Sequence, residues 1–409
     1  MEKPDETGAF HAGGNRLRIL IYKWKAYNYR DIKETFLAMG HEVDVIEQKL
    51  ESYDRDEAFE RRLEQMLKKK KYDFVFTVNY FAVVSIVCEK CKVKYLSWSC
   101  DNPLISMYHR SVFHDYNYIF NFDKSNCLEF RGMGVKHMYY LPLAVDTDRL
   151  DAIIDGADDL ELYRNEVAFV GSLYERNTYD KLKIVLPDYL RGYLEAVMQA
   201  QMSVSGANII EEMLTPDILE QLQQYFKLEK SEDSFSDLGL IFSTTVLGFK
   251  IAAMQRKNGL IALSKQVPVS IYTNSNTKEL IRVDYRGSVD YWTQMPKVFR
   301  MSRINLNFTI PNIKTGLPLR MWDIMGAGGF LMTNFQAELP EIFVEDRDFV
   351  CFDGEKDLVE KTLYYLSHEK ERETIAMHGY EKVKKMHSYR IRLQQMLDVV
   401  FGEKIEERQ

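Results

Sequence analysis

Hydrophobic and polar residues alternate along the chain in blocks that predict strands and helices in turn. Residues 17–22 (LRILIY) form an apolar run between polar residues, which predicts a buried strand. Apolar residues at helical spacing follow it and stop at Gly40, a residue type that commonly ends helices. The alternating segment 41–47 (HEVDVIE) predicts a strand, and residues 59–67 predict a second amphipathic helix. This alternation of strands and helices predicts right-handed βαβ units and a parallel sheet covered on both faces.

The same exchange continues in two series along the rest of the chain. The first series adds strands at residues 74–78, 94–98 and 117–122. The second series follows an acidic stretch at 151–159 and has strands at residues 166–173, 268–273, 304–309, 329–334 and 349–352. Residues 179–265 predict helices, and a final helix is expected over residues 389–401.

These two series predict an α/β molecule with two Rossmann-like halves. The expected parts, in chain order, are a mobile tail, an N-terminal domain, a linker, a C-terminal domain with a helical insertion at about 179–265, and a C-terminal helix, with bounds at residues 1–15, 16–150, 151–164, 165–386 and 387–409. Ligands of doubly wound sheets bind outside the carboxyl ends of the strands. The functional site is therefore expected in the cleft between the two halves.

Composition and charge narrow the class of protein. The 409 residues carry 54 Lys and Arg against 61 Asp and Glu, a net charge of -7, which lacks the basic footprint of a general nucleic-acid binder. The longest apolar run, residues 80–88, has about nine residues, far fewer than the roughly 20 that span a bilayer. Residues 1–15 contain no apolar core of a secretory signal, and five cysteines spread over a long chain favour a reducing compartment. We expect a cytoplasmic protein without a transmembrane segment.

Several motifs of common enzymes are missing from the sequence or carry little information. No Gly-rich dinucleotide fingerprint follows the first strand, and there is neither a Walker A motif nor a GxSxG elbow. Cys88 and Cys91 form a single CxxC pair, which cannot alone close a four-ligand zinc site. Asp-x-Asp triplets occur at 54–56, 146–148 and 346–348, about as often as chance gives. We expect neither a metal site nor a bound cofactor.

The segment 97–103 (SWSCDNP) directly follows a predicted strand. The carboxyl end of a parallel strand faces the cleft, and Pro103 prevents the chain from returning to the sheet. Asp101 is therefore a candidate general base that takes a proton from a hydroxyl group. The alternative, a structural carboxylate at a helix cap or in an Asx turn, remains open from the spacing.

The segment 304–334 predicts a strand, a loop and a helix that together form an anion site. Gly316 lies in the loop, Pro318 lies near the first turn of the helix, and Arg320 adds a cationic fork there. A helix N-terminus offers unpaired N–H groups and the positive end of a dipole, which suits a diphosphate. Asp323, further along the helix, is placed to accept hydrogen bonds from ribose hydroxyls. The alternative is that Asp323 pairs with a nearby base on a packed helix.

Several segments together resemble a known family. They are WSCDNP (98–103), YYLPLAVD (139–146), FVGSLYERN (169–177), MPKVFRMSRINLNFT (295–309), GLPLRMWDIMGAGGF (316–330) and HSYRIR (387–392). The C-terminal half resembles the spore-maturation CgeB-like glycosyltransferases, and the N-terminal half resembles the domain of unknown function that accompanies them in bacterial glycan loci. The resemblance covers the chain from about residue 16.

The resemblance implies two facing Rossmann-like lobes, the GT-B glycosyltransferase architecture, with a helical insertion in the C-terminal half. A nucleotide-sugar would be held mainly by the C-terminal lobe. The resemblance places Gly171 and Ser172 in a loop near the donor phosphates or the acceptor, with Arg176 as a second phosphate cation. Tyr272 and residues 286–291 fall where such enzymes bind the base, although an aromatic residue at a strand end is also typical of a core.

The same resemblance completes the expected donor site. Its members in the loop and helix are Thr315, Gly316, Leu317, Arg320 and Asp323. Thr315 and Asp323 stand where related enzymes of that fold often have two glutamates. The second acid is therefore one carbon shorter here, and the first is replaced by a hydroxyl.

We therefore expect a cytoplasmic glycosyltransferase of the hexosyl or deoxyhexosyl type. It would move a sugar from a nucleoside-diphosphate sugar to a glycan, glycolipid or protein acceptor, without a divalent metal. The expected partners are these two substrates and no nucleic acid, with a homo-oligomer or a peripheral membrane contact left open. The alternatives are a catalytically silent GT-B-fold partner and a sugar- or nucleotide-binding protein.

Overall fold

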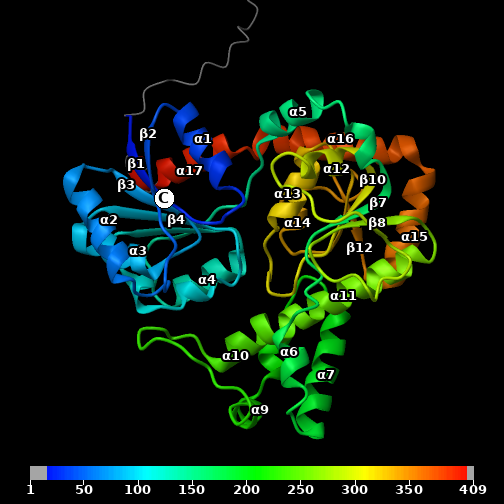
Figure 1. Ribbon diagram of the computed structural model, residues 1–409, viewed down its shortest axis with the longest axis horizontal. Coiled ribbons are helices and arrows are strands. Elements are labelled where there is room, and N and C mark those ends of the chain that lie inside the picture. The colour runs from blue at the N-terminus through cyan, green and yellow to red at the C-terminus, as the bar shows by residue number, and fades with distance from the viewer. Residues whose placement is uncertain (1–15, 403–409) are drawn as a thin grey trace, which may run out of the picture.

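The computed structural model describes residues 16–402, which form two lobes around two parallel sheets (Figure 1). Within these residues the strand orders are β2-β1-β3-β4-β5-β6 in the N-terminal lobe and β12-β11-β10-β7-β8-β9 in the C-terminal lobe. All strand pairs of both described sheets are parallel. The predicted fold class, two Rossmann-like halves with helices around parallel sheets, is confirmed.

The N-terminal lobe follows the predicted exchange of strands and helices. Its strands are β1 Arg18–Lys23, β2 Glu42–Glu47, β3 Phe74–Val78, β4 Lys94–Ser99, β5 Asn117–Asn121 and β6 Met138–Tyr140. Its helices are α1 Tyr29–Ala38, α2 Glu57–Lys69, α3 Ala82–Cys91 and α4 Lys124–Gly132, with short 3-10 helices at Ile105–Met107 and Arg110–Phe113. Every residue of β3 is buried, because helices cover both faces of the sheet.

The C-terminal lobe is built in the same way. Its strands are β7 Asn165–Val170, β8 Val269–Tyr272, β9 Asp284–Tyr285, β10 Ser302–Asn307, β11 Leu331–Asn334 and β12 Val350–Phe352. Its helices are α12 Met295–Met301, α13 Leu319–Gly326, α14 Leu339–Ile342, α15 Gly354–Ser367 and α16 Glu369–Met386. Pro318 occupies the N-cap position of α13 without a side-chain hydrogen bond, and Gly328 after the helix has a φ of +71°, which residues other than glycine rarely adopt.

Helices also occupy the region between β6 and β8. They are α5 Thr147–Asp155, a 3-10 helix at Leu160–Tyr163, α6 Thr178–Leu182, α7 Asp188–Met202, α8 Ile210–Met213, α9 Pro216–Leu222, α10 Leu238–Ile241, a π-helical turn at Phe242–Val246 and α11 Leu247–Ser264. The expected linker, 151–164, therefore contains the end of α5 and a 3-10 helix. The segment before α10 reaches the N-terminal lobe, where Ser234 forms an antiparallel bridge with His109 (Figure 1).

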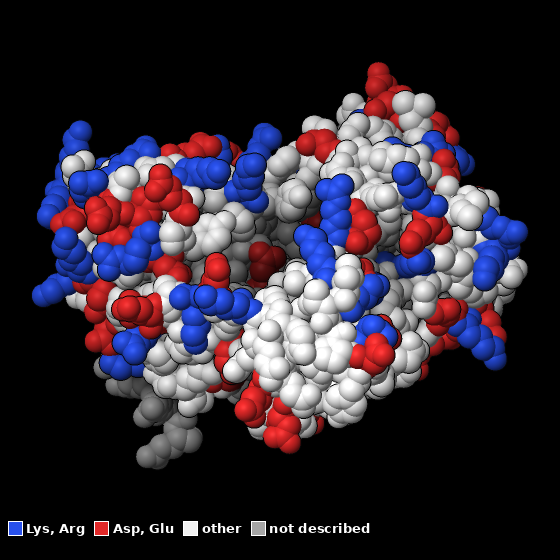
Figure 2. All heavy atoms as spheres, turned by 60° about the horizontal axis from the view of Figure 1, so that its bottom comes forward, with Lys and Arg blue, Asp and Glu red and all other residues white. Residues whose placement is uncertain are grey.

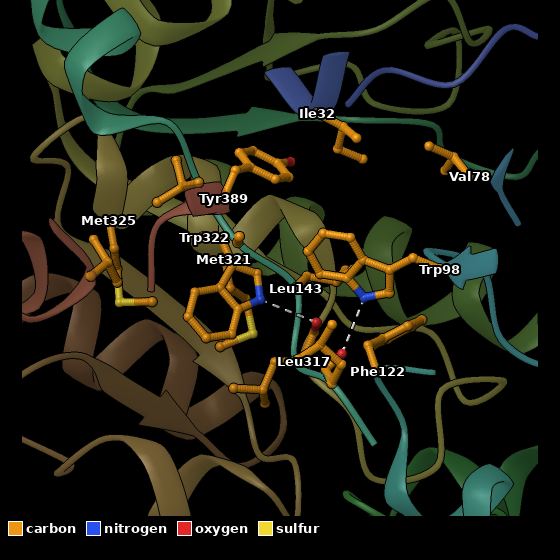
Figure 3. Packing of buried hydrophobic residues seen from close by; sticks show 14 of the residues in the cluster. Ile32, Val78, Trp98, Phe122, Leu143, Leu317, Met321, Trp322, Met325 and Tyr389 are labelled. Carbon is orange, nitrogen blue, oxygen red and sulfur yellow. Dashed lines mark hydrogen bonds between the residues drawn. The ribbon is translucent and has the colours of Figure 1, made fainter. Parts of the chain in front are cut away.

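The C-terminal helix α17, Tyr389–Phe401, returns to the N-terminal lobe and packs beside α1 (Figure 1). Tyr389 belongs to a buried cluster that draws on both lobes, with Ile32 and Trp98 from one and Trp322 from the other (Figure 3). The rings of Trp98 and Tyr389 lie 6.0 Å apart. The two lobes therefore share one hydrophobic core, which fixes their facing edges.

Some sequence predictions need qualification. The expected tail at 1–15 lies outside the described residues, as do residues 403–409. The helical stretch Leu238–Ser264 is long and apolar enough to span a membrane by length and composition, although half of its most apolar window is buried. Phe242, Val246 and Ile251 from this stretch pack in a core cluster with α7 and α9, as in a buried helix.

Candidate functional site

A cavity of about 500 Å³ opens between the two lobes. Figure 2 shows the surface hollowed between the two halves of the molecule. One wall comes from loops at the carboxyl ends of β1, β3 and β4, and the opposite wall comes from the C-terminal half. Its lining includes Trp24, Tyr53, Asn79 and Asp101 on the first wall, and Tyr174, Phe249 and Asn312 on the second. We call this space the interlobe cavity.

Asp101 lies on the N-terminal wall of the interlobe cavity, as the sequence predicts. Its Oδ2 accepts a hydrogen bond from Nδ2 of Asn79 at 2.7 Å. Oδ1 of Asn79 in turn accepts the backbone N–H of Cys100 at 2.8 Å, so one amide side chain orients the whole turn. The next short helix is capped by Leu104, and Asp101 therefore caps no helix among the described residues. Its carboxylate is exposed and available for acid–base chemistry.

The loop before α13 is held by the N-terminal lobe. The backbone N–H groups of Thr315 and Gly316 donate to Oδ2 of Asp123 at 2.9 and 3.1 Å. The hydroxyl of Thr315 lies 3.0 Å from Oδ1 of Asp123 and 2.8 Å from Oε1 of Glu338. Asp123 also caps α4, through the backbone N–H of Asn126 at 3.0 Å. One carboxylate thus occupies two amides of the loop that leads to the helix N-terminus, where the sequence predicts a phosphate.

The fit around Gly316 is close. A Cβ at this position would lie 2.7 Å from the carbonyl oxygen of Phe122, in the N-terminal lobe. Leu317 is buried, and its carbonyl accepts the indole N–H of Trp322 at 3.3 Å (Figure 3). The glycine is therefore required here by an approach of backbone to backbone across the lobes.

Asp323 is buried in the same region. Its Oδ1 accepts the hydroxyl of Tyr291 at 3.0 Å, and its Oδ2 lies 3.8 Å from Nη1 of Arg320. Burial raises the pKa of Asp323 to about 6, while the Arg320 charge and the Tyr291 hydrogen bond work against that effect. The residue is 4% exposed. This is the packed-helix arrangement that the sequence leaves open beside a ribose contact.

The other donor-site residues expected from the sequence are spread over the lobe. Gly171 donates its N–H to the carbonyl of Tyr272 at 3.1 Å, so it remains part of the sheet edge. Tyr272 is buried, and its hydroxyl donates to Oδ1 of Asn165 at 3.2 Å. Arg176 has a side chain that is 91% exposed and lies 3.9 Å from Glu175. The structure therefore does not bring Arg176 and Tyr272 together with Arg320.

Arg256 of α11 is a residue that the sequence analysis missed. Its Nη1 donates to the carbonyl of Ser172 at 2.6 Å and its Nη2 to the carbonyl of Phe308 at 2.8 Å. The guanidinium also lies 4.8 Å from the ring centre of Tyr174, which lines the interlobe cavity. Burial lowers the pKa of Arg256, and the nearby positive charge of Arg320 adds to this effect.

Arg320 lies close enough to Arg256 for its positive charge to lower the pKa of Arg256, and Arg320 itself lies 3.8 Å from the carboxylate of Asp323. Among the described residues, no carboxylate lies within ion-pair distance of Arg256, and Nε of Arg256 is buried without a hydrogen-bond partner. A partly neutralised pair of guanidinium groups would attract an anion. Only the fold reveals this pairing, because Arg256 and Arg320 come from separate helices.

A second buried polar contact also joins the lobes. Arg149 of α5 donates to the carboxylate of Asp31 in α1 at 2.6 and 3.1 Å. Burial raises the pKa of Asp31, and the Arg149 charge opposes the rise. The Arg149 guanidinium also lies 4.8 Å from the ring centre of Trp292. The ion pair joins α1 to α5, and the Trp292 contact extends it to the loop before α12.

One carboxylate of each Asp-x-Asp triplet has a structural role. Asp56 and Asp146 cap α2 and α5, and Asp348 accepts the backbone N–H of Val344 at 2.9 Å. Within residues 16–402, no group of three His, Cys, Asp or Glu side chains is arranged to hold a metal ion. All five cysteines, Cys88 and Cys91 included, are free.

Comparisons with known proteins place this geometry in context. Residues 252–398 match the model of a family described as glycosyl transferase-like. No curated protein matches the chain. Three solved structures resemble the chain with 10% sequence identity, and each match covers 95% of this chain and 100% of the other. They are Anabaena HepE in complex with UDP and glucose (TM-score 0.53), sucrose-phosphate synthase from Thermosynechococcus elongatus (TM-score 0.53) and a glycosyltransferase from Rickettsia africae (TM-score 0.52). These likenesses show that the chain has the GT-B fold.

Proposed function

We propose that this chain is a glycosyltransferase that moves a sugar from a nucleoside-diphosphate sugar to a hydroxyl of a glycan, glycolipid or protein. The observation that carries the proposal is the interlobe cavity of a GT-B fold, with Asp101 on one wall and the Arg256 guanidinium against Tyr174 of the other. The glycosyl transferase-like match over residues 252–398 supports the same class. The CgeB-like subtype is part of this proposal and rests on the sequence segments alone.

We assign the donor diphosphate to the C-terminal wall. Arg256 and Arg320 carry fixed positive charge there, and the amides of Thr315 and Gly316 can join them once Asp123 releases the loop. HepE, which shares the fold, has also been crystallised with UDP-glucose. Ser172 and Gly171 border this position through the Arg256 contact. Arg176 and Tyr272 lie outside the assignment because one is exposed and the other is buried.

Asp101 takes the role of acceptor base in this proposal. It lies on the opposite wall, and its hydrogen bond from Asn79 holds one carboxylate oxygen in place. A carboxylate so placed removes the proton from the acceptor hydroxyl as that oxygen attacks the sugar. The arginines and the loop amides stabilise the leaving diphosphate, so that the reaction needs no divalent ion.

A cytoplasmic location is also part of the proposal. All five cysteines are free, and two of them, Cys88 and Cys91, are close in sequence without forming a disulfide. Free cysteines at this number are typical of a reducing compartment.

A panel of UDP-, GDP-, dTDP- and CMP-sugars tests the proposal. One nucleotide is expected to raise the melting temperature, because a ligand that binds only the native state stabilises it. The matching sugar should then be hydrolysed or transferred by the purified protein, and turnover should persist in excess chelator. If no nucleotide-sugar binds, the proposal is wrong. If activity is lost with chelator and restored by Mg²⁺ or Mn²⁺, the metal-independent mechanism is wrong.

A catalytically silent GT-B partner is the second candidate. The observation in its favour is the loop before α13, where Thr315 replaces an acid and Asp123 occupies the two amides. Binding of a nucleotide without hydrolysis or transfer to any acceptor would favour this alternative.

A further inference from the structure

The N-terminal lobe contains a second, larger cavity of about 990 Å³. It lies at the carboxyl ends of β1 and β2 and at the first turn of α1, and Trp292 of the other lobe closes one side. We call it the basic cavity, because Lys23, Lys25, Arg30, Lys33 and Lys49 line it. The function proposed above does not use this space.

The positive charge of the basic cavity is only partly compensated. Lys23 pairs with Glu47 at 2.8 Å, and Lys33 lies 3.4 Å from Glu34. Within the described part of the chain, no carboxylate lies at ion-pair distance from Lys25, Arg30 or Lys49. Three cations thus remain in one concave space of a protein whose net charge is -7. Such a local concentration of positive charge attracts an anion even though the protein as a whole is negatively charged.

Aromatic side chains form the walls between these charges. Trp24 is fixed because its indole N–H donates to the carbonyl of Val78 at 2.6 Å. The Arg30 guanidinium lies 5.5 Å from the ring centre of Trp292. Tyr53 is 57% exposed, and its ring packs edge-to-face against the ring of Phe81 with a centroid distance of 5.5 Å. Exposed aromatic faces next to cations suit the apolar faces of sugar rings that carry negative groups.

The basic cavity and the interlobe cavity share two lining residues, Trp24 and Tyr53. A saccharide held over these rings would therefore extend from the cations toward the wall that carries Asp101. Lys25, Arg30 and Lys49 are exposed, and they line the same concave space as the aromatic rings. This shape favours a small acidic ligand over a membrane.

We propose that the basic cavity binds an acidic saccharide, one that bears phosphate or carboxylate groups, as the acceptor whose hydroxyl points toward Asp101. This proposal rests on the transferase function proposed above and adds the chemical class of the acceptor. Lys25, Arg30 and Lys49 bind the anionic groups, and Trp24, Tyr53 and Trp292 contact the rings.

Calorimetry on the full chain tests the proposal with three probes. They are a hyaluronan tetrasaccharide, which carries carboxylates, glucose 6-phosphate, which carries phosphate, and cellotetraose, which is neutral. At least one acidic probe should bind, and cellotetraose should bind at least about tenfold more weakly. Binding of the acidic probe should weaken as salt rises from about 0.05 to about 0.5 M, because salt screens exposed charges. Tighter binding of the hyaluronan tetrasaccharide would identify carboxylate as the preferred anionic group of the ligand, and tighter binding of glucose 6-phosphate would identify phosphate.

A triple variant, Lys25→Gln, Arg30→Gln and Lys49→Gln, links binding to this cavity. It should lose at least about tenfold in affinity for the acidic probe, because charge-assisted hydrogen bonds are lost. A matched triple variant of exposed lysines elsewhere, Lys69→Gln, Lys71→Gln and Lys278→Gln, makes the same charge change and should bind as the parent does. Circular dichroism of both variants checks that the fold is kept.

Three results would overturn the proposal. The first is equal binding of neutral and acidic saccharides, and the second is unchanged affinity of the first triple variant for the acidic probe. The third is that no saccharide binds, while the protein pellets with phosphatidylglycerol vesicles and the first triple variant does not. UDP affinity, measured in the same samples, separates the two proposals. If acidic saccharides bind through the three cations while no nucleotide binds, the cavity assignment holds and the transferase function fails.

Discussion

The carboxylate of Asp123 in the N-terminal lobe accepts the backbone N–H of Gly316 in the C-terminal lobe at 3.1 Å. The same oxygen accepts the N–H of Thr315 at 2.9 Å. These are the bonds that a phosphate oxygen would make at a loop before a helix. The carboxylate therefore lies next to the helix N-terminus where the sequence predicts the donor phosphate, and a phosphate bound to these amides would compete with it.

Replacement of Asp123 by Asn should strengthen binding of the nucleoside diphosphate. Asn keeps the cap of α4, because both residue types cap helices well. It removes the negative charge, so that the loop amides are held less firmly and repulsion of the phosphates falls. We expect an increase of about tenfold in UDP affinity by calorimetry, equal to about 1.4 kcal/mol.

Asp56→Asn is the control for this change. Asp56 caps α2 by the same geometry, with the N–H of Phe59 at 3.0 Å, and lies away from the loop before α13. Its replacement should leave UDP affinity unchanged. If Asp123→Asn binds UDP no better than the parent, the amides of Thr315 and Gly316 do not belong to the donor site.

Asp101→Asn should reduce sugar transfer by about 10²- to 10⁴-fold, since the variant lacks a general base. The shape of the turn should be kept, because the Asn carbonyl can still accept the hydrogen bond from Nδ2 of Asn79. Affinity for the donor, measured by calorimetry, should change little. Near-normal transfer would show that Asp101 only supports the turn.

The sequence predicts most of the fold because the strands are apolar runs with clear polar ends. The predicted strand at 74–78 coincides with β3, whose neighbours Asp73 and Asn79 are polar. The hydrophobic pattern of the sequence does not predict β6 and β9, which are short. Both residues of β9, Asp284 and Tyr285, are exposed, so that backbone pairing alone defines the strand.

The candidate site is predictable only where chain order determines position. Asp101 follows β4, and the carboxyl end of any strand in a parallel sheet must face the cleft. Asp123 and Arg256 gave no signal, because their contacts join residues far apart in sequence. Asp123 meets Gly316 across the lobes, and Arg256 meets Ser172 across the helical insertion. Such contacts depend on how the lobes and insertion pack, which spacing in the sequence does not determine.

Asp323 should make stability depend on pH. Burial raises its pKa from about 3.8 when unfolded to about 6 in the fold, so the folded protein binds this proton more tightly. The stability from this group is present below pH 4 and is lost as pH rises through about 6. Asp323→Asn mimics the protonated acid and can still accept the Tyr291 hydroxyl.

Denaturant unfolding at pH 4 and pH 7 measures this effect. The free energy of unfolding of the Asn variant minus that of the parent should be about 1 to 3 kcal/mol larger at pH 7 than at pH 4. One pKa unit corresponds to about 1.4 kcal/mol. Asp158→Asn, at an exposed carboxylate in the segment after α5, is the control and should show no such gain. An equal difference at both pH values would mean that Asp323 stays ionised in the fold.

Arg256 and Arg320 should distinguish a nucleoside diphosphate from a nucleoside. Arg256 contacts Tyr174 on the wall of the interlobe cavity, Arg320 is close enough to lower its pKa, and the proposal assigns both to the two phosphates. Arg256→Gln and Arg320→Gln should each weaken UDP binding by about ten- to a hundredfold, because a hydrogen bond to a charged group contributes about 1.5 to 3 kcal/mol. Uridine, which carries no phosphate, should lose far less affinity. Arg300→Gln removes an exposed guanidinium on α12 and should affect neither ligand. Equal losses for UDP and uridine would show that the two arginines support the shape of the site and do not contact the phosphates.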